Sequence, residues 1–370
     1  MSKNAIIFRL RRSNEKIEET KASLLELTEL LKTLHISVVE TVIQHKERPS
    51  PAFLIGEGKV EEIAQIAAEH SVKLVVSDNN LTPTQKRNLG NKLELEVSDR
   101  TAVILEIFRK RARSHEGKLQ VEIASMKYSL TMISGHGISM MQQTSGTGAV
   151  RSKGIGETQS ELDKRKIRKR ILVLSKQLEE LIKQRGTQRK SRKKQGIPIV
   201  SLVGYTNAGK STLFSLLSKS EAFIADSLFA TLDPNVKKVT LPDGCSFLLV
   251  DTVGFIKNLP TFLVNAFRAT LEEILEGQLL LNVIDFSDPR HDVQEDATLG
   301  ILSQLGAMNI PRINVYNKLD LLDRSDQEKR LSQNSLNSGH VYISCQEKTG
   351  ISSLISLIRS KIFQKAGCGE

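Results

Sequence analysis

The sequence predicts an α/β protein with three parts: a small α/β unit, an antiparallel helical hairpin, and a larger domain built on an open, mostly parallel sheet with helices on both faces. Three observations support this prediction. Short apolar runs alternate with helical stretches through the C-terminal half, the same alternation occurs on a smaller scale near the N-terminus, and two helices with matching apolar stripes lie between. With 370 residues, the chain is long enough for two or three domains.

The larger domain is expected over residues 198–366. Its first strand, 198–203, is a short apolar run followed by glycine, as is typical of a buried parallel strand. Helical stretches fall between most of the later apolar runs, and this order favours a parallel sheet. The further strands are expected at residues 236–241, 246–250, 279–285, 312–316 and 340–344, and a last helix at residues 351–364.

The smaller α/β unit is expected over residues 1–115. Two stretches in it have helical periodicity, and three have strand character. The expected helices are residues 17–33 and 59–70, and the expected strands are residues 5–9, 37–44 and 72–77.

The helical hairpin is expected over residues 116–190. Both helices carry apolar residues at successive spacings of 4, 3, 4 and 3, so each has one apolar stripe. Two matched stripes favour an antiparallel pair, although each helix could instead pack on a different domain. The glycine-rich segment 134–156 would form the tip, and residues 191–197 a basic linker. The stripes are Leu119, Ile123, Met126, Leu130 and Ile133, then Ile167, Ile171, Leu174, Leu178 and Leu181.

Most of the net charge of +11 lies in one segment. Residues 161–194 contain 14 Lys or Arg against 4 Asp or Glu, a local excess of 10 positive charges. Such a run can be a solvated helix face and a linker, but at this density it favours a polyanionic partner, above all nucleic acid. Aromatic residues make up only 4% of the chain and Trp is absent, which argues against a surface that stacks single-stranded bases.

Nothing in the sequence predicts insertion into a membrane. The longest apolar run, residues 279–284, has the length of a strand and falls well short of the roughly 18 residues that span a bilayer. No apolar signal core follows the N-terminal Met1. The three cysteines lie far apart, without metal-ligand spacing or a disulfide framework, so we expect a cytoplasmic protein.

A phosphate-binding loop follows the first strand of the larger domain. Eight consecutive residues fit the pattern Gly-x4-Gly-Lys-Ser without a mismatch, and a helix is expected directly after them. In such a loop the backbone amides wrap the β-phosphate, Lys210 reaches the β- and γ-phosphates, and Ser211 ligates Mg²⁺. The residues are Gly204, Tyr205, Thr206, Asn207, Ala208, Gly209, Lys210 and Ser211.

Three further motifs lie downstream in the order of a P-loop GTPase. We expect Thr231 to be the switch threonine and a second Mg²⁺ ligand, Asp251 to hold Mg²⁺ through water, and the Gly254 amide to donate to the γ-phosphate. Asp320 would accept from the N1–H and N2–H of guanine, which selects GTP. Lys210, Thr231 and Gly254 are the expected catalytic residues. The three motifs are Phe229, Ala230, Thr231, Leu232 and Asp233; Asp251, Thr252, Val253 and Gly254; and Asn317, Lys318, Leu319 and Asp320. Ser344 and Cys345, at the end of the next strand, would back the base.

The residue after Gly254 is Phe255, where many GTPases have a glutamine that orients the attacking water. An apolar ring cannot hydrogen-bond to water. Either another group or a partner orders the water, or Phe255 is a core residue and a distant side chain does so. Both interpretations predict slow unassisted hydrolysis.

The chain resembles the HflX family of translational GTPases over nearly its whole length. The resemblance rests on Asp251-Thr-Val-Gly-Phe255 together with segments outside the general GTPase motifs: residues 56–61, 78–88, 99–101, 116–122 and 156–161. It implies an N-terminal domain particular to the family, a coiled-coil hairpin and a GTPase domain. It also implies binding to the large ribosomal subunit and its RNA, and the splitting or rescue of stalled or stressed ribosomes.

Two alternatives remain open at this point. In one, GTP switches the affinity of an RNA- or ribosome-binding protein that splits nothing. In the other, the GTPase assists assembly or an RNA-modifying enzyme. We expect a monomer in each case. The basic segment favours RNA over a membrane, because no apolar anchor accompanies it.

Overall fold

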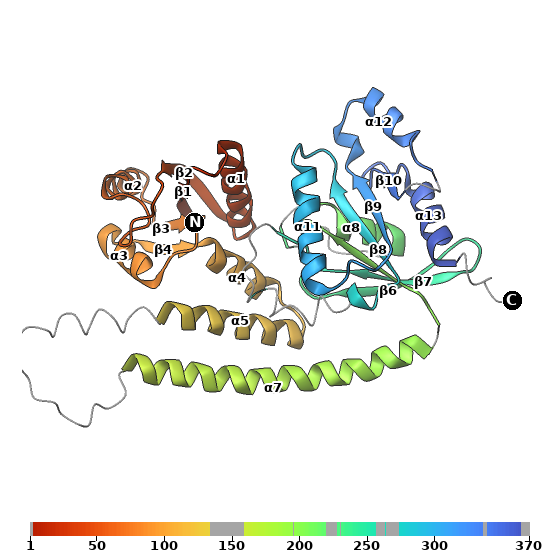
Figure 1. Ribbon diagram of the computed structural model, residues 1–370, viewed down its shortest axis with the longest axis horizontal. Helices are drawn as coiled ribbons and strands as arrows, with labels where there is room; N and C mark the ends of the chain where they lie inside the picture. The colour runs from red at the N-terminus through yellow and green to blue at the C-terminus, as the bar shows by residue number, and fades with distance from the viewer. Residues whose placement is uncertain are drawn as a thin grey trace, which may run out of the picture. The chain divides into compact units, whose positions relative to one another are not determined.

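The computed structural model describes residues 3–133, 159–194, 196–219, 228–229, 231–256, 263, 274–335 and 339–363, with only the backbone of residues 159 and 185–194 (Figure 1). The chain divides into two compact units. The first comprises residues 1–110 and 118–178, and the second comprises residues 111–117 and 179–370. The α/β class predicted for both ends of the chain is confirmed.

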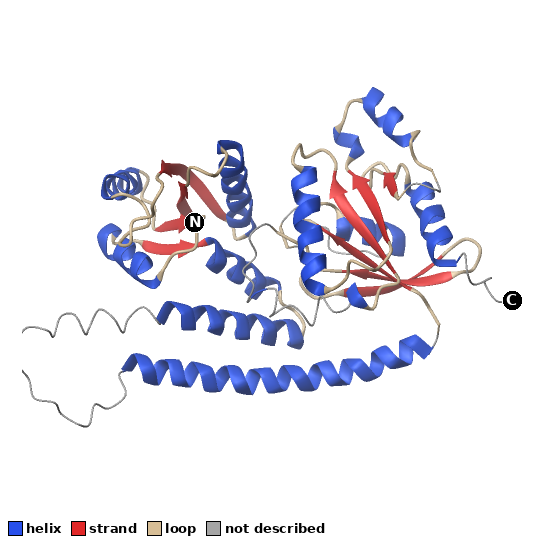
Figure 2. Cartoon of the chain, in the orientation of Figure 1, coloured by secondary structure: helices blue, strands red, loops and turns tan. Residues whose placement is uncertain are grey.

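The first unit contains a four-stranded parallel sheet in the order β2-β1-β3-β4. The apolar side chains of β1 are almost completely buried, since the strand is covered on both faces. Helices α1 to α4 alternate with its strands along the chain (Figure 2). The elements are β1 (Lys3–Arg11), α1 (Ile17–Thr33), β2 (Ile36–His45), α2 (Glu57–Glu69), β3 (Leu74–Ser77), α3 (Pro83–Leu93), β4 (Glu96–Asp99) and α4 (Arg100–Arg111).

A buried ion network stands at the carboxyl ends of β1, β3 and β4. Asp78, whose side chain has no exposed surface, accepts from Arg9 through one oxygen and from Arg100, at 2.8 Å, through the other. Burial alone would raise the pKa of Asp78, but Arg100, Ser23 and Arg9 together hold it below its ordinary value. Arg9 and Arg100 also pair with Glu15 and Glu26. The network therefore joins α1 to three strands.

The two helices of the predicted hairpin are α5 (His115–Ile133) and α7 (Gln159–Lys194). They lie side by side and antiparallel (Figure 1), and Arg170 pairs with Glu122 across them at 3.1 Å. Leu119, Ile123 and Leu174 of the predicted stripes are buried. α7 continues through Lys194, so it includes the first four residues of the segment 191–197 expected as a linker. The predicted tip, 134–156, lies outside the described residues.

The second unit contains a six-stranded sheet in the order β10-β9-β8-β5-β7-β6, parallel except for β6. Its strands match the predicted runs to within a few residues. The elements are β5 (Ile199–Gly204), α8 (Lys210–Ser218), β6 (Asn235–Thr240), β7 (Ser246–Asp251), β8 (Leu279–Asp285), α11 (His291–Leu305), β9 (Arg312–Asn317), the short 3-10 helix η1 (Leu319–Leu321), α12 (Arg324–Leu331), β10 (His340–Tyr342) and α13 (Ile351–Phe363).

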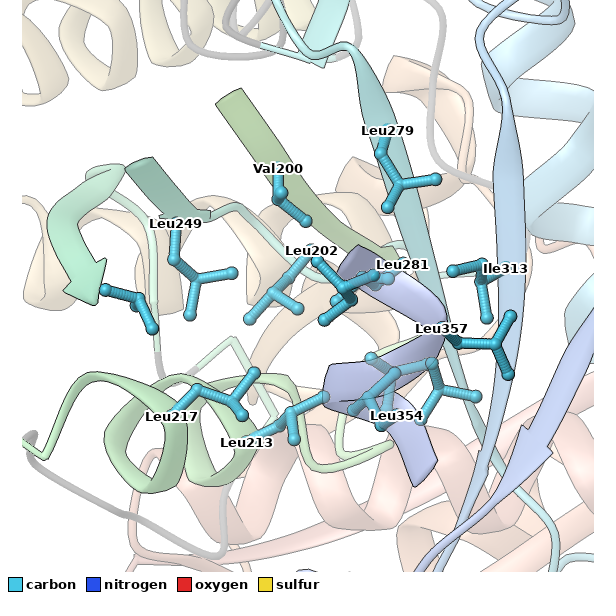
Figure 3. Packing of buried hydrophobic residues seen from close by; sticks show 14 of the residues in the cluster. Val200, Leu202, Leu213, Leu217, Leu249, Leu279, Leu281, Ile313, Leu354 and Leu357 are labelled. Carbon is cyan, nitrogen blue, oxygen red and sulfur yellow. The ribbon is translucent and has the colours of Figure 1, made fainter. Parts of the chain in front are cut away.

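Helices cover both faces of this sheet. On one face α8 and α13 pack on the central strands, and alternate strand residues point at them, as a period of two requires. On the other face Asn314 of β9 donates to Glu295 of α11 at 2.6 Å. Figure 3 shows the first layer, in which Val200, Leu202, Leu249, Leu279, Leu281 and Ile313 of the strands meet Leu213, Leu217, Leu354 and Leu357 of the helices.

Among the described residues no helix is long and apolar enough to cross a membrane. Cys345 is a free, buried thiol.

Candidate nucleotide site

The predicted phosphate-binding loop joins β5 to α8, and α8 begins at Lys210. Lys210 is buried, and its Nζ donates to the carbonyl oxygens of Gly204 at 3.0 Å and Tyr205 at 2.6 Å. Burial lowers the pKa of Lys210 to about 8, against the opposing attraction of Asp251. The loop amides, the helix N-terminus and this ammonium group together favour an anion at the loop.

Three side-chain oxygens meet beside the loop. Ser211 Oγ and Thr231 Oγ1 lie 2.8 Å apart, and each lies 2.9 Å from Asp251 Oδ2. Asp251 Oδ1 is buried and has no hydrogen-bond partner among the described residues. Burial raises the pKa of Asp251, although Lys210 and the two hydroxyl groups oppose the shift. Two hydroxyl groups and a carboxylate with a spare oxygen fit Mg²⁺, which prefers oxygen ligands.

The residues after β7 form backbone hydrogen bonds with the phosphate-binding loop. The Phe255 N–H donates to the Gly204 carbonyl at 3.1 Å, and the Phe255 carbonyl accepts from the Thr206 N–H at 2.8 Å. A Cβ built on Gly254 would lie 2.9 Å from Lys210 Nζ and 3.0 Å from the backbone Cα of Thr206, so a side chain here would crowd the loop. The backbone of Gly254 therefore lies against the lysine of the loop.

The side chains of this segment face inward. Phe255 is 4% exposed and Val253 6% exposed, and Thr252 Oγ1 donates to the Leu202 carbonyl at 2.6 Å. These contacts fix the end of β7 to β5. Phe255 is thus buried like a core residue, as the second of the two interpretations above expects.

Asn317, at the end of β9, connects three segments. Its Nδ2 donates to the Ala208 carbonyl at 2.9 Å, and its Oδ1 accepts from the Cys345 N–H at 3.1 Å. The next residue, Lys318, pairs with Asp285 at the end of β8 at 2.7 Å. The sheet thus brings together the phosphate-binding loop and the two segments predicted to hold the base.

Asp320 follows in η1, and its Oδ1 accepts from Ser344 Oγ. Ser344 has no exposed surface and also accepts from the Glu347 N–H at 3.0 Å. Leu319 is buried, and burial raises the pKa of the Cys345 thiol to about 12, with Asp320 adding to the shift. The carboxylate of Asp320 is therefore oriented by a buried serine.

Within the switch segment 229–233, only Ala230 lies outside the described residues. Phe229 and Leu232 are buried. Asp233 does not face the oxygen cluster: its Oδ2 accepts from the N–H groups of Arg113 at 2.9 Å and Ser114 at 2.8 Å. Its partners precede it by 120 and 119 positions.

Two of these contacts were not predicted from the sequence. The first is the pairing of Asp285 with Lys318. Asp285 ends a predicted strand, and a polar residue at the carboxyl edge of a parallel sheet is a signal that it takes part in a site. Ser114 lies directly before α5, as an N-cap residue does. No local pattern connects Ser114 to Asp233.

Three families match successive parts of the chain. The family described as "GTP-binding GTPase N-terminal" matches residues 21–109, "GTP-binding GTPase Middle Region" matches residues 111–192, and "50S ribosome-binding GTPase" matches residues 199–318. Among solved structures, a GTP-binding protein from Sulfolobus solfataricus in complex with GDP is 24% identical, with a TM-score of 0.47 and 98% of both chains covered.

Curated relatives are closer in sequence. The chain is 44% identical to the GTPase HflX of Caldanaerobacter subterraneus, over 94% of this chain and 78% of that protein. It is 40% identical to the GTPase HflX of Escherichia coli, over 91% of this chain and 78% of that protein. At these identities over most of both chains, the chain belongs to the HflX family of GTPases, and with its P-loop GTPase domain it is a GTP hydrolase.

Proposed function

We propose that this GTPase binds the large ribosomal subunit and its RNA when it holds GTP, and that it thereby splits or rescues stalled or stressed ribosomes. The observation that carries the proposal is the basic helix α7, which stands directly before a GTPase domain matching the family described as "50S ribosome-binding GTPase". We place the protein in the cytoplasm, where ribosomes are.

The described part of α7 supports an RNA partner by its exposed charge. Arg168, Lys169 and Lys176 are exposed, and so is Arg170 beside its partner Glu122. Cations in water are available to phosphates, and each one placed near a phosphate releases counterions. An ordered helix presents these charges in fixed positions, so the helix favours docking on structured RNA over diffuse attraction.

We assign the phosphates to the loop of residues 204–211. Lys210 would exchange its two carbonyl partners for the β- and γ-phosphates, and the loop amides would hold the β-phosphate. Ser211 and Thr231 would ligate Mg²⁺, and Asp251 would hold it through water. When bound, Mg²⁺ neutralises charge on the β- and γ-phosphates.

We assign guanine to Asp320, whose carboxylate would accept from N1–H and N2–H of the base. Asn317 would hold the base segment against the loop, and the segment of Ser344 and Cys345 would back the base. A buried polar pair discriminates well between bases, because a wrong base leaves groups unpaired.

Hydrolysis in this site would be slow without a partner. The Gly254 amide would donate to the γ-phosphate, but the adjoining Phe255 ring is buried and has no group that can hold a water. A group supplied by the large subunit, or ordered by it, would complete the site. The GTPase cycle would then depend on the ribosome.

Sucrose-gradient sedimentation of ribosomes tests this proposal. Wild-type protein is run with GTP, GDP and a non-hydrolysable GTP analogue. Co-sedimentation with large subunits in GTP and the analogue, with loss of intact ribosomes, supports the proposal. If the analogue also splits ribosomes, binding energy suffices and hydrolysis serves release. Binding without splitting contradicts the splitting half, and absence of binding in all three states contradicts the whole.

A further inference from the structure

Asp233 forms a contact that neither the GTPase motifs nor the proposed ribosomal role accounts for. Its carboxylate accepts from the backbone N–H groups of Arg113 and Ser114 and from Ser114 Oγ. Ser114 Oγ in turn accepts from the Gly117 N–H at 2.9 Å. The carboxylate and the serine thus satisfy amides at the start of α5, where a helix leaves its first N–H groups unpaired.

The fit around this carboxylate is close. A Cβ built on Gly117 would overlap Asp233 Oδ1 and lie 3.1 Å from Ser114 Oγ, so an added methyl group would displace the carboxylate from this contact. Residues 111–117, which include the first three residues of α5, belong to the same compact unit as the GTPase domain. The contact is therefore part of the GTPase unit.

The other end of the same short segment lies in the nucleotide site. Thr231 precedes Asp233 by two residues and lies within hydrogen-bond distance of Ser211 and Asp251. Leu232, between them, is 3% exposed and is held in the core. Two residues span at most about 7 Å of chain. A shift of Thr231 by several ångströms would therefore stretch or break the hydrogen bonds of Asp233.

We propose that Asp233 is a positioning residue for GTP hydrolysis: anchored on the turn of residues 113–117, it holds Thr231 in reach of the metal and the γ-phosphate. The same anchor makes the start of α5 sense which nucleotide is bound. This goes beyond the proposed ribosomal function, because it requires only the GTP hydrolase activity of the isolated chain.

Asp233→Ala tests the anchor through hydrolysis of GTP by the isolated protein. We expect kcat to fall by about tenfold or more, with a smaller change in KM, since a misplacement of about 1 Å can cost about a hundredfold in rate. Asp233→Asn should recover part of the loss, because an amide oxygen in the place of Oδ2 still accepts from the N–H groups of Arg113 and Ser114.

Gly117→Ala gives a second test by a different route. Its methyl group would push against Asp233 Oδ1, so kcat should fall in the wild-type background. In the Asp233→Ala background the obstacle is gone, and Gly117→Ala should have little further effect. This non-additivity is what a contact between the two positions requires.

Thr82→Ala is the matched control for the loss of a helix cap. Thr82 Oγ1 accepts from the Gln85 N–H at 3.2 Å at the start of α3, in the other unit. This variant should lower the Tm and leave kcat unchanged. If Asp233→Ala behaves in the same way, its role is structural and the proposal is wrong.

Amide hydrogen exchange measures the sensing directly. With Mg²⁺ and a non-hydrolysable GTP analogue, the amides of Ser114 and Gly117 should exchange at a different rate than with GDP, and the difference should vanish in Asp233→Ala. Equal exchange in the two nucleotide states of the wild-type protein would overturn the coupling, whatever the variants do.

Discussion

Replacing Asp320 by asparagine tests the assignment of the guanine site. The carboxylate would accept two hydrogen bonds from guanine, and an amide can accept only one while its NH2 group meets a donor. Hydrogen bonds to a charged group contribute about 1.5–3 kcal/mol each, and an unpaired donor adds to the cost. The loss of about 3–5 kcal/mol corresponds to a weakening of GTP binding by about a hundredfold to a few thousandfold.

The structure makes this substitution a clean one. Asp320 Oδ1 accepts from the buried Ser344, and the amide oxygen of asparagine can keep that contact. The fold around η1 should therefore survive. Asp326→Asn, at an exposed position of α12 in the same unit, is the matched control for the removal of one negative charge.

The assay is equilibrium binding of guanine and xanthine nucleotides by titration calorimetry. Asp320→Asn should bind GTP much more weakly and xanthosine triphosphate more tightly than the wild type, because xanthine offers an acceptor where guanine has its NH2 group. Asp326→Asn should bind like the wild type. Unchanged GTP affinity in Asp320→Asn, with no gain for the xanthine nucleotide, would refute the base assignment.

Three further predictions concern the ion network, the basic helix and Phe255. Asp78→Asn should lower the free energy of unfolding by about 3–5 kcal/mol at neutral pH, because it removes the buried carboxylate that Arg9 and Arg100 share and leaves each with its glutamate partner only. Since the folded pKa of Asp78 is depressed, its contribution is present above about pH 4 and lost as pH falls. Urea titrations of the two proteins should therefore converge in acid, and a constant difference would contradict the network. Neutralising five cations at the end of α7 should flatten the salt dependence of ribosome binding without changing GTP affinity. If the slope of ribosome affinity against salt concentration is unaltered, the segment does not contact RNA and serves only as a linker. Phe255→Gln should leave ribosome-stimulated turnover nearly unchanged if the ribosome positions the water, and a large rise in phosphate release would show that it does not. The five cations are Arg189, Lys190, Arg192, Lys193 and Lys194.

Much of the GTPase domain could be predicted because its signals are local. The phosphate-binding loop is a contiguous run between a buried strand and a helix, and Asn317 follows an apolar strand. Strand β4, Glu96–Asp99, was missed, since it has four residues and pairs only with β3. Short strands of this kind are specified by the neighbouring strand more than by their own residues.

The rest depends on contacts between residues that are distant in the sequence. The bond between Asp233 and Ser114 joins positions 119 residues apart, and no periodicity encodes it. The backbone bonds of Phe255 to the phosphate-binding loop depend on the parallel pairing of β5 with β7. The end of α7 was placed early because a run of Lys and Arg was interpreted as a linker, although both residues favour helix.

The most direct test of the account is the rate of phosphate release from GTP with and without large ribosomal subunits. The account predicts slow release by the isolated protein, because Phe255 cannot orient the attacking water, and a large increase on addition of subunits. Groups supplied by a partner raise the rate of other GTPases by about 10³–10⁵, so even a partial effect should be plain. Fast release by the isolated protein, with no further gain from large subunits, would contradict a site that the ribosome completes.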